Sequence, residues 1–406
     1  MKTKIKDILY RLSALMSLIF IMASCNNDDN PESPYVDNKT ETTILIYAVA
    51  SNNLESNLTS DKNEILSCAS QLDLDRNKLL VYEIKNSYEP VLLELVKGGD
   101  GNYSYKTIKE YDTDLSSLDA RRMKEVFNDM RDNYKSEKYG LILWSHGTGL
   151  DYYPETKTRS EEIEAVSLPM AYSFGYDKNP ETGTVTQMNI DVLANAIPDN
   201  LFSFIWFDAC YMSGIETIYE LRDKCDVFVG YPTEVFEWGM AYNLVIPHIL
   251  KTTPDLVEGA RAFFNYYAEN ANQYARVATV AVIDMDKLPA LAEISSEIYA
   301  LDSEVDIRKI QKYTRNTVGP FYDLNGYMLQ KIKNAGDDSL ENEWRKALDD
   351  LIIYKASTTV DFNYNSIDLD QFSGISCHIY NPDSNSDYEN YYRQLDWFKN
   401  VVSVTE

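Results

Sequence analysis

Two residues that could perform nucleophilic chemistry follow two apolar segments of the chain. His146 comes shortly after the run 141–144, and Cys210 comes shortly after the run 204–207. A free thiol is mostly protonated at neutral pH, whereas an imidazole partner favours the thiolate, which is the nucleophile. The two segments therefore predict a cysteine–histidine site, if the fold brings their ends together.

Acyl transfer also needs hydrogen-bond donors for the oxyanion that develops in the transition state. Gly147 has no side chain to block approach, and its N–H together with that of Cys210 could supply two donors. Taken singly, the His146–Gly147 pair also fits a turn after a strand, and Cys210 also fits a buried structural thiol. The helix predicted at 214–224 would add its positive N-terminal end near the thiolate, which is a smaller contribution.

The elements that must position these residues alternate between strands and helices. This alternation predicts an α/β fold with a mostly parallel sheet covered on both faces, and sites in such sheets form beyond the carboxyl ends of the strands. From residue 287 onward the pattern is mostly helical and ends with a predicted helix at 388–401. The apolar run 375–380 interrupts it. The other predicted strands are 42–50, 78–84, 91–96, 103–108, 227–231 and 277–283, and the other helices are 61–72, 116–134, 190–196, 241–250 and 254–272.

The N-terminus has the features of an export signal. A basic start is followed by a largely apolar stretch at 12–22, which is shorter than the roughly 20 residues that span a bilayer. The small residues before Cys25 resemble a bacterial lipoprotein signal, which implies a signal peptide at 1–24 and a lipidated Cys25. Residues 25–40 then form a flexible tether. An ordinary cleaved signal is the alternative. The resemblance implies export and a lipid anchor to the cell envelope, with the outer membrane and the cell surface as candidate locations.

Composition and net charge limit the classes of partner that the protein could bind. The 406 residues are 44% hydrophobic and 25% charged, which is typical of globular proteins, and the formal net charge is −26. This acidic balance argues against nucleic-acid binding and favours cationic substrates, although solubility is its simplest meaning. The cysteines have no zinc-ligand spacing, and no calcium-binding loop pattern is present. We therefore expect no metal site.

The two reactive segments together resemble those of the clostripain family of cysteine peptidases, which belongs to the caspase-like fold group. The motifs are W-S-H-G-T-G at 144–149 and F-D-A-C-Y-M at 207–212 followed by Glu216, with Y-A-V-A-S-N-N-L at 47–54 and weaker matches at 323–324, 373–376 and Trp397. The resemblance spans about residues 41 to 402. It implies a caspase-like three-layer αβα sandwich at 41–285, with a mainly helical C-terminal subdomain at 286–406.

The resemblance also implies roles for individual residues. His146 would be the general base and Cys210 the nucleophile of an enzyme that cleaves after Arg or Lys. Asp208 would lie at the base of the specificity pocket, where a carboxylate can pair a long cationic side chain; a helix-capping or loop-bracing role is the alternative. Glu234 and Trp238 would shape the same pocket.

Family members are often activated by cleavage between the two reactive segments. Residues 151–188 are irregular and contain Lys157, Arg159 and Lys178, where a basic-specific enzyme could cut itself; a solvated loop is the alternative. No cofactor is required, and calcium is suggested by the resemblance alone. The sequence thus predicts an exported cysteine endopeptidase acting through a thioester acyl-enzyme on peptides or proteins with Arg or Lys. The competing hypothesis is a catalytically inactive surface-binding lipoprotein that retains the fold.

Overall fold

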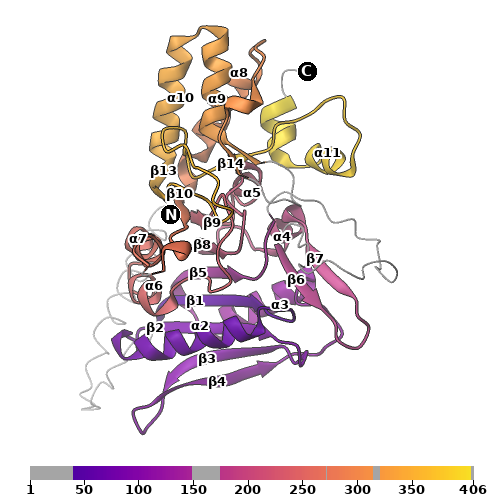
Figure 1. The fold of residues 1–406 in the computed structure, drawn as a ribbon. Coiled ribbons are helices and arrows are strands. Elements are labelled where there is room, and N and C mark those ends of the chain that lie inside the picture. Colours follow the sequence, from indigo (N-terminus) through magenta and orange to yellow (C-terminus); the bar gives the residue numbers. More distant parts are fainter. Residues whose placement is uncertain (1–39, 149–173, 271, 314–320, 404–406) are drawn as a thin grey trace, which may run out of the picture. The chain divides into compact units, whose positions relative to one another are not determined.

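A nine-stranded sheet forms the centre of the fold (Figure 1). The computed structural model describes residues 40–148, 174–270, 272–313 and 321–403. The strand order is β13-β10-β9-β8-β5-β1-β2-β3-β4. The strands are β1 (Thr40–Val49), β2 (Asn77–Ile84), β3 (Val91–Lys97), β4 (Tyr103–Glu110), β5 (Ser136–Trp144), β8 (Phe202–Asp208), β9 (Cys225–Gly230), β10 (Thr279–Asp284) and β13 (Ile352–Ser357).

The five central strands run parallel, and antiparallel strands extend the sheet at both edges. β2, β1, β5, β8 and β9 pair in parallel, whereas β3 and β4 on one side and β10 and β13 on the other pair antiparallel. Strands covered on both faces need apolar residues at successive positions, which explains why the central strands appear in the sequence as continuous apolar runs. The prediction of a mostly parallel α/β sheet is confirmed.

Helices cover both faces of this sheet. Neighbouring residues of a strand point to opposite faces, so each central strand contributes to two cores. Ile142, Trp144 and Trp206 belong to the first core, and Leu143 and Phe207 belong to the second. The first face carries α2 (Glu55–Cys68), α6 (Tyr242–Ile249) and α7 (Leu256–Ala268), and the second carries α3 (Ala120–Asn133), α4 (Ile190–Ala196) and α5 (Ile215–Glu220). The layering matches the predicted αβα sandwich.

The C-terminal third is mainly helical, as predicted, and Figure 1 shows its long helices together at the top. It also supplies β13 to the central sheet, an element that the sequence did not predict, so the division at residue 285 stays a prediction. The helix expected at 388–401 is divided, because α11 ends at Tyr392 and a π-helical turn follows at Phe398–Val402. The other elements here are α8 (Leu288–Tyr299), α9 (Leu324–Ala335), α10 (Asp338–Leu351) and α11 (Asp387–Tyr392), with short strands β11 (Lys312–Tyr313), β12 (Phe321–Asp323) and β14 (Ser376–Cys377).

A hairpin occupies the end of the region that was expected to be irregular. β6 (Phe174–Lys178) and β7 (Val185–Met188) pair antiparallel directly before α4. None of the helices in the described ranges is long and apolar enough to cross a membrane. The predicted signal peptide and Cys25 lie outside the described residues.

Candidate active site

The ends of β5 and β8 lie side by side. The two strands are parallel neighbours, with Trp144 opposite Asp208, and the Ser145 N–H lies 3.4 Å from the Asp208 carbonyl oxygen. Beyond the strand ends, the backbone of Gly147 packs against that of Cys210. A Cβ atom added at Gly147 would lie only 2.6 Å from the Cys210 carbonyl oxygen. The structure thus brings together the segments that carry His146 and Cys210.

Cys210 is the most exposed of the four cysteines that the structure describes. Its Sγ lies 3.3 Å from the Val235 N–H nitrogen, which donates to it, and 3.5 Å from the Val235 carbonyl oxygen. The other three described thiols are buried, and burial raises the pKa of each of them, so they are poor nucleophiles. These buried cysteines are Cys68, Cys225 and Cys377. Position and exposure therefore make Cys210 the best candidate for a nucleophile among the described cysteines.

A strained turn presents Cys210 at the end of β8. Tyr211 has a φ of 59°, in the left-handed region that a bulky side chain rarely adopts. Its N–H donates to the Thr233 carbonyl oxygen at 3.0 Å, and its ring packs against Phe321 with centroids 5.7 Å apart. A residue held in this region costs on the order of 1–3 kcal/mol, and these contacts offset that cost. The turn directs the chain toward α5 and leaves Cys210 at the tip.

His146 is held from two sides. Its Nε2 lies 2.8 Å from Oδ1 of Asn53, a residue of the loop between β1 and α2. Its carbonyl oxygen accepts from the Gly175 N–H at 2.9 Å, and its ring meets the edge of Tyr176 with centroids 6.3 Å apart. Asn53 had no predicted role, although it lies in the 47–54 motif. The signal that could have found it is its place after a buried parallel strand, which puts it at the same sheet edge.

Asp208 lies beneath a loop formed by residues 239–242. Its side chain is buried, with 5% exposure, and its Oδ2 accepts from the Met240 N–H and the Tyr242 hydroxyl, both at 3.0 Å. Gly239 has a φ of 59°, and a Cβ there would lie 2.7 Å from the same oxygen, so the loop closes tightly over the carboxylate. Burial raises the pKa of Asp208 to about 6. Asp208 therefore braces this loop, as the alternative interpretation predicted. The same residue can still lie at the base of a specificity pocket.

A second carboxyl group lies behind Asp208. Oδ2 of Asp61, on α2, accepts from the indole N–H of Trp144 at 2.8 Å. Burial, and then the charge of Asp208, raise the pKa of Asp61 to about 9. Asp61 is therefore neutral at pH 7, and Asp208 is the carboxyl group of this pair that ionises there.

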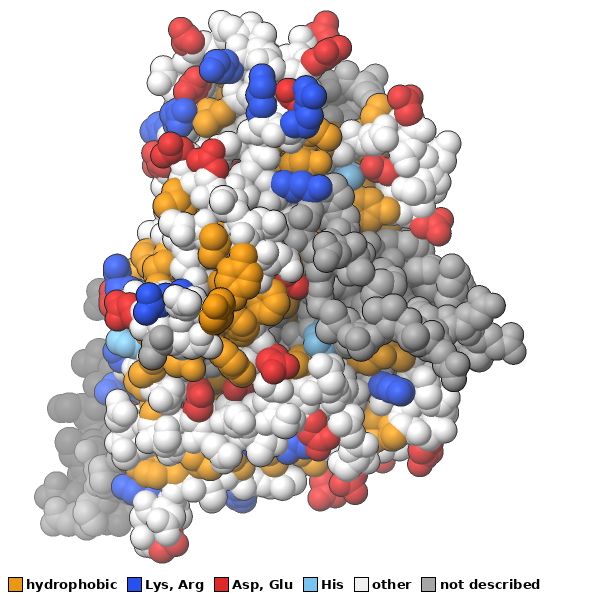
Figure 2. All heavy atoms as spheres, viewed as in Figure 1, with side chains coloured by type: hydrophobic (Ala, Val, Ile, Leu, Met, Phe, Trp, Pro, Cys, Tyr) orange, Lys and Arg blue, Asp and Glu red, His pale blue; other side chains and the backbone are white. Residues whose placement is uncertain are grey.

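The other predicted pocket residues have different surroundings. Glu234 is buried, and its Oε2 accepts from the Asn363 side-chain amide at 3.0 Å. Trp238 is 44% exposed and stacks on Phe236 with centroids 5.0 Å apart; Phe236 in turn packs on Phe362. In Figure 2, hydrophobic side chains gather near the middle of the viewed face. Trp238 thus offers an apolar surface, whereas Glu234 braces the loop around Asn363.

The predicted processing residues fall into two groups. Lys157 and Arg159 lie outside the described residues. Lys178 is exposed but belongs to β6, and its N–H donates to the Ser51 carbonyl oxygen at 3.1 Å. The expectation of irregular structure is therefore wrong at Lys178, where the backbone is part of a hairpin, although the residue is exposed.

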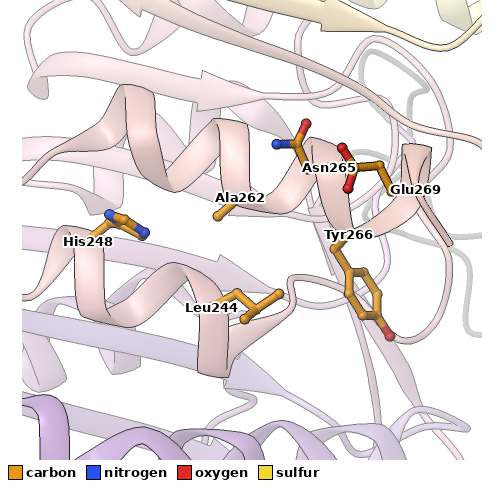
Figure 3. Close-up of a pocket in the computed structure, with 6 residues that line it drawn as sticks. All are labelled: Leu244, His248, Ala262, Asn265, Tyr266 and Glu269. Carbon is orange, nitrogen blue, oxygen red and sulfur yellow. The ribbon is translucent and has the colours of Figure 1, made fainter.

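A groove between α6 and α7 is separate from these residues (Figure 3). It has a volume of about 380 Å³ and contains none of the predicted site residues. Within the described ranges, no group of three His, Cys, Asp or Glu side chains could hold a metal ion. The groove is lined by Leu244, His248, Ala262, Asn265, Tyr266 and Glu269.

Comparisons with known proteins identify a family and solved structures that this chain resembles. The model of the clostripain family matches residues 46–405. A secreted C11 cysteine protease from Bacteroides thetaiotaomicron, solved with an irreversible peptide inhibitor, is 29% identical, with a TM-score of 0.73 over 89% of this chain and 98% of that one. An inactive zymogen C11 protease from Parabacteroides distasonis is 25% identical, with a TM-score of 0.71 over 89% of this chain and 98% of that one. The search of curated proteins gave no match.

The family match covers the central sheet from within β1 to β13, both reactive strand ends and the helices of the C-terminal third. Each of the two similar structures aligns with nearly nine-tenths of the chain. The chain therefore belongs to the clostripain family and is a cysteine-type peptidase.

Proposed function

We propose that the protein is an endopeptidase that cleaves after Arg or Lys, with Cys210 as nucleophile and His146 as general base. The observation that carries this proposal is the contact between the two strand ends, where Gly147 packs directly on the backbone of Cys210. This contact keeps the loop that bears His146 beside the nucleophile. The family supports the reaction class, and the geometry supports the choice of these two residues.

The mechanism follows from these groups. His146 takes the proton of the Cys210 thiol, and the thiolate attacks the carbonyl carbon of the scissile peptide bond. The oxyanion that forms would be bound by the N–H groups of Gly147 and Cys210. His146 then gives the proton to the leaving amine, which departs and leaves a thioester on Cys210. A water molecule, deprotonated by His146, hydrolyses the thioester and restores the thiol.

The surroundings of Asp208 support the proposal of a specificity for basic residues. Both hydrogen bonds that it receives from the described residues end on Oδ2, which leaves Oδ1 to meet a ligand. These donors are an amide and a phenol rather than a cation, so no described residue supplies a counter-ion to the buried charge, and an Arg or Lys side chain of the substrate would supply one. The exposed ring of Trp238 would cover the aliphatic stem of that side chain, and Glu234 would fix the loop that carries the ring.

Activation and location are further parts of the proposal. We propose self-cleavage after Lys157 or Arg159, which is supported by the zymogen description of one similar structure. Export is supported by the description of another as secreted, and the lipid anchor on Cys25 rests on the signal sequence. No step of the mechanism needs a cofactor, and a calcium requirement rests on the family resemblance alone.

The test compares the wild-type protein with a Cys210→Ala variant on fluorogenic peptides that end in Arg, Lys or Leu. We expect release from the Arg and Lys peptides by the wild-type protein alone. Equal, negligible release by both proteins, with calcium added and after limited proteolysis, would favour the inactive surface-binding alternative. Release that favours Leu would remove Asp208 from the specificity role and leave the dyad in place.

A further inference from the structure

We infer that Asn53 is a positioning residue for His146, and that its Oδ1 selects the ring nitrogen that meets Cys210. The inference rests on the proposed dyad. It deepens that proposal by naming Nδ1 of His146 as the nitrogen that accepts the thiol proton and Nε2 as the nitrogen that Asn53 holds.

The contact itself determines the tautomer. Oδ1 of Asn53 and Nε2 of His146 are 2.8 Å apart, which is a hydrogen-bond distance. An amide oxygen can only accept, so Nε2 must carry the hydrogen, and in the neutral ring Nδ1 is then the basic nitrogen. This is the role of the third group in other nucleophile–base pairs, where the base is oriented by a hydrogen bond on its far side.

Asn53 sits in a loop that is fixed on both sides. The side-chain amide of the preceding residue, Asn52, donates to the carbonyl oxygens of Val49 at 3.0 Å and Tyr176 at 2.7 Å. Its side-chain oxygen accepts from the Leu54 N–H at 2.8 Å, which closes a turn around Asn53. The end of β1, the start of α2 and β6 therefore all contribute to the position of Asn53.

A buried carboxylate anchors the same loop. Asp177, which is 1% exposed, accepts from the hydroxyl of Ser51 and from the N–H of Ser117. Asp177 belongs to β6, the strand whose Tyr176 ring contacts the imidazole of His146. One strand thus fixes both partners of the Asn53–His146 hydrogen bond, which is the arrangement that a positioning contact requires.

The proton transfers balance with these assignments. The thiol proton of Cys210 moves to Nδ1 of His146, while the hydrogen on Nε2 stays in its bond to Asn53. The imidazolium then returns the Nδ1 proton to the leaving amine. The Asn53 oxygen stabilises the imidazolium through its dipole, without taking a proton itself.

The experiment compares Asn53→Ala and Asn53→Asp with a matched control, Asn63→Ala, which alters an exposed residue of α2. Steady-state kcat and KM are measured on an Arg peptide between pH 5 and 9. We expect Asn53→Ala to lower kcat by roughly 10- to 100-fold with KM little changed, because a misplacement of about 1 Å can cost on the order of 100-fold. We expect the control to match the wild-type protein.

The aspartate variant tests the positioning role through the pH profile of kcat, which a purely structural role of Asn53 would leave unchanged. Asn53→Asp keeps an acceptor for Nε2, so it should recover most of kcat, and its negative charge should raise the pKa of His146 and move the acidic limb of the kcat profile to higher pH. An unchanged kcat and pH profile in both Asn53 variants would overturn the inference. A higher kcat in Asn53→Ala would also overturn it, by showing that the contact holds the imidazole away from the thiol.

A second measurement separates this inference from the proposed specificity. The rate of alkylation of Cys210 by iodoacetamide, followed against pH, reports the thiolate without any substrate. We expect its midpoint to move to higher pH in Asn53→Ala, because the imidazolium that stabilises the thiolate is less well placed. If peptides with Arg and Lys are not cleaved but this shift occurs, the specificity proposal fails and the positioning role stands. An unshifted midpoint counts against the positioning role, whatever the peptide result.

Discussion

The carboxylate of Asp208 lies under a loop whose amide and phenol groups both donate to one of its oxygens. Its pKa is raised to about 6 by burial, so it becomes protonated as the pH falls through that value. We expect kcat/KM for an Arg peptide to fall about tenfold per pH unit below pH 6, because a neutral carboxyl group cannot pair the substrate cation. The measurement is kcat/KM against pH on Arg and norleucine peptides. An equal decline for both would assign the pH dependence to another group.

The same burial carries a stability cost. A carboxyl group whose pKa rises from 3.8 to about 6 on folding destabilises the ionised folded state by about 3 kcal/mol. The cost is fully present above pH 6 and disappears as the pH falls toward 3.8. We therefore expect Asp208→Asn to raise the free energy of unfolding by up to this amount at pH 8 and by little at pH 4, as measured by urea denaturation. The variant should lose cleavage after Arg, and no gain in stability at pH 8 would contradict the raised pKa.

At the scale of elements, the tips beyond the paired strands β5 and β8 approach closely because Gly147 has no side chain. A methyl group at Gly147 would lie 2.6 Å from the backbone of Cys210, so the two tips would have to separate. We expect Gly147→Ala to cost about 1–3 kcal/mol of stability and to lower kcat by on the order of 100-fold. Gly99→Ala is the matched control, because nothing lies within 4 Å of a Cβ added there. Urea denaturation and peptide kinetics that leave Gly147→Ala equal to this control would show that the close approach is dispensable.

The sequence predicts β5 and β8 because both are apolar runs that are followed directly by polar residues. The sequence does not predict β13, because α10 ends at Leu351 and β13 begins at the next residue, Ile352. No turn residues mark the change from the helical to the extended pattern. The sequence places Asp208 two positions before Cys210 but does not reveal the burial of the Asp208 side chain. The loop that covers it is about 30 positions further along the chain, and only the folded chain brings them together. The contact of Asn53 with His146 also forms only in the folded chain, although the place of Asn53 after a buried strand is a signal for it in the sequence.

At the scale of the whole molecule, the predicted N-terminal signal would decide where the enzyme works. If Cys25 carries the lipid, Cys25→Ala should move the protein from the membrane fraction to the soluble fraction of an expressing Gram-negative cell. Its activity per molecule should stay unchanged, because residues 40–403 contain every site residue that the mechanism uses. Fractionation with an Asn26→Ala control measures this. Retention of Cys25→Ala in the membrane would exclude the lipid as the anchor.

The strand order determines what self-cleavage would produce. β1 to β5 precede residues 149–173 in the chain and β8, β9, β10 and β13 follow them, and the two groups join in the sheet through the β5–β8 pair. A cut after Lys157 or Arg159 would therefore give a noncovalent heterodimer, with His146 on one polypeptide and Cys210 on the other.

That heterodimer can be tested by complementation. The cleaved protein should give two bands under denaturing conditions and one mass under native conditions. Each polypeptide, separated in urea and refolded alone, should be inactive, and mixing the two should restore cleavage. Activity in either polypeptide alone would contradict an active site that spans the subunit boundary.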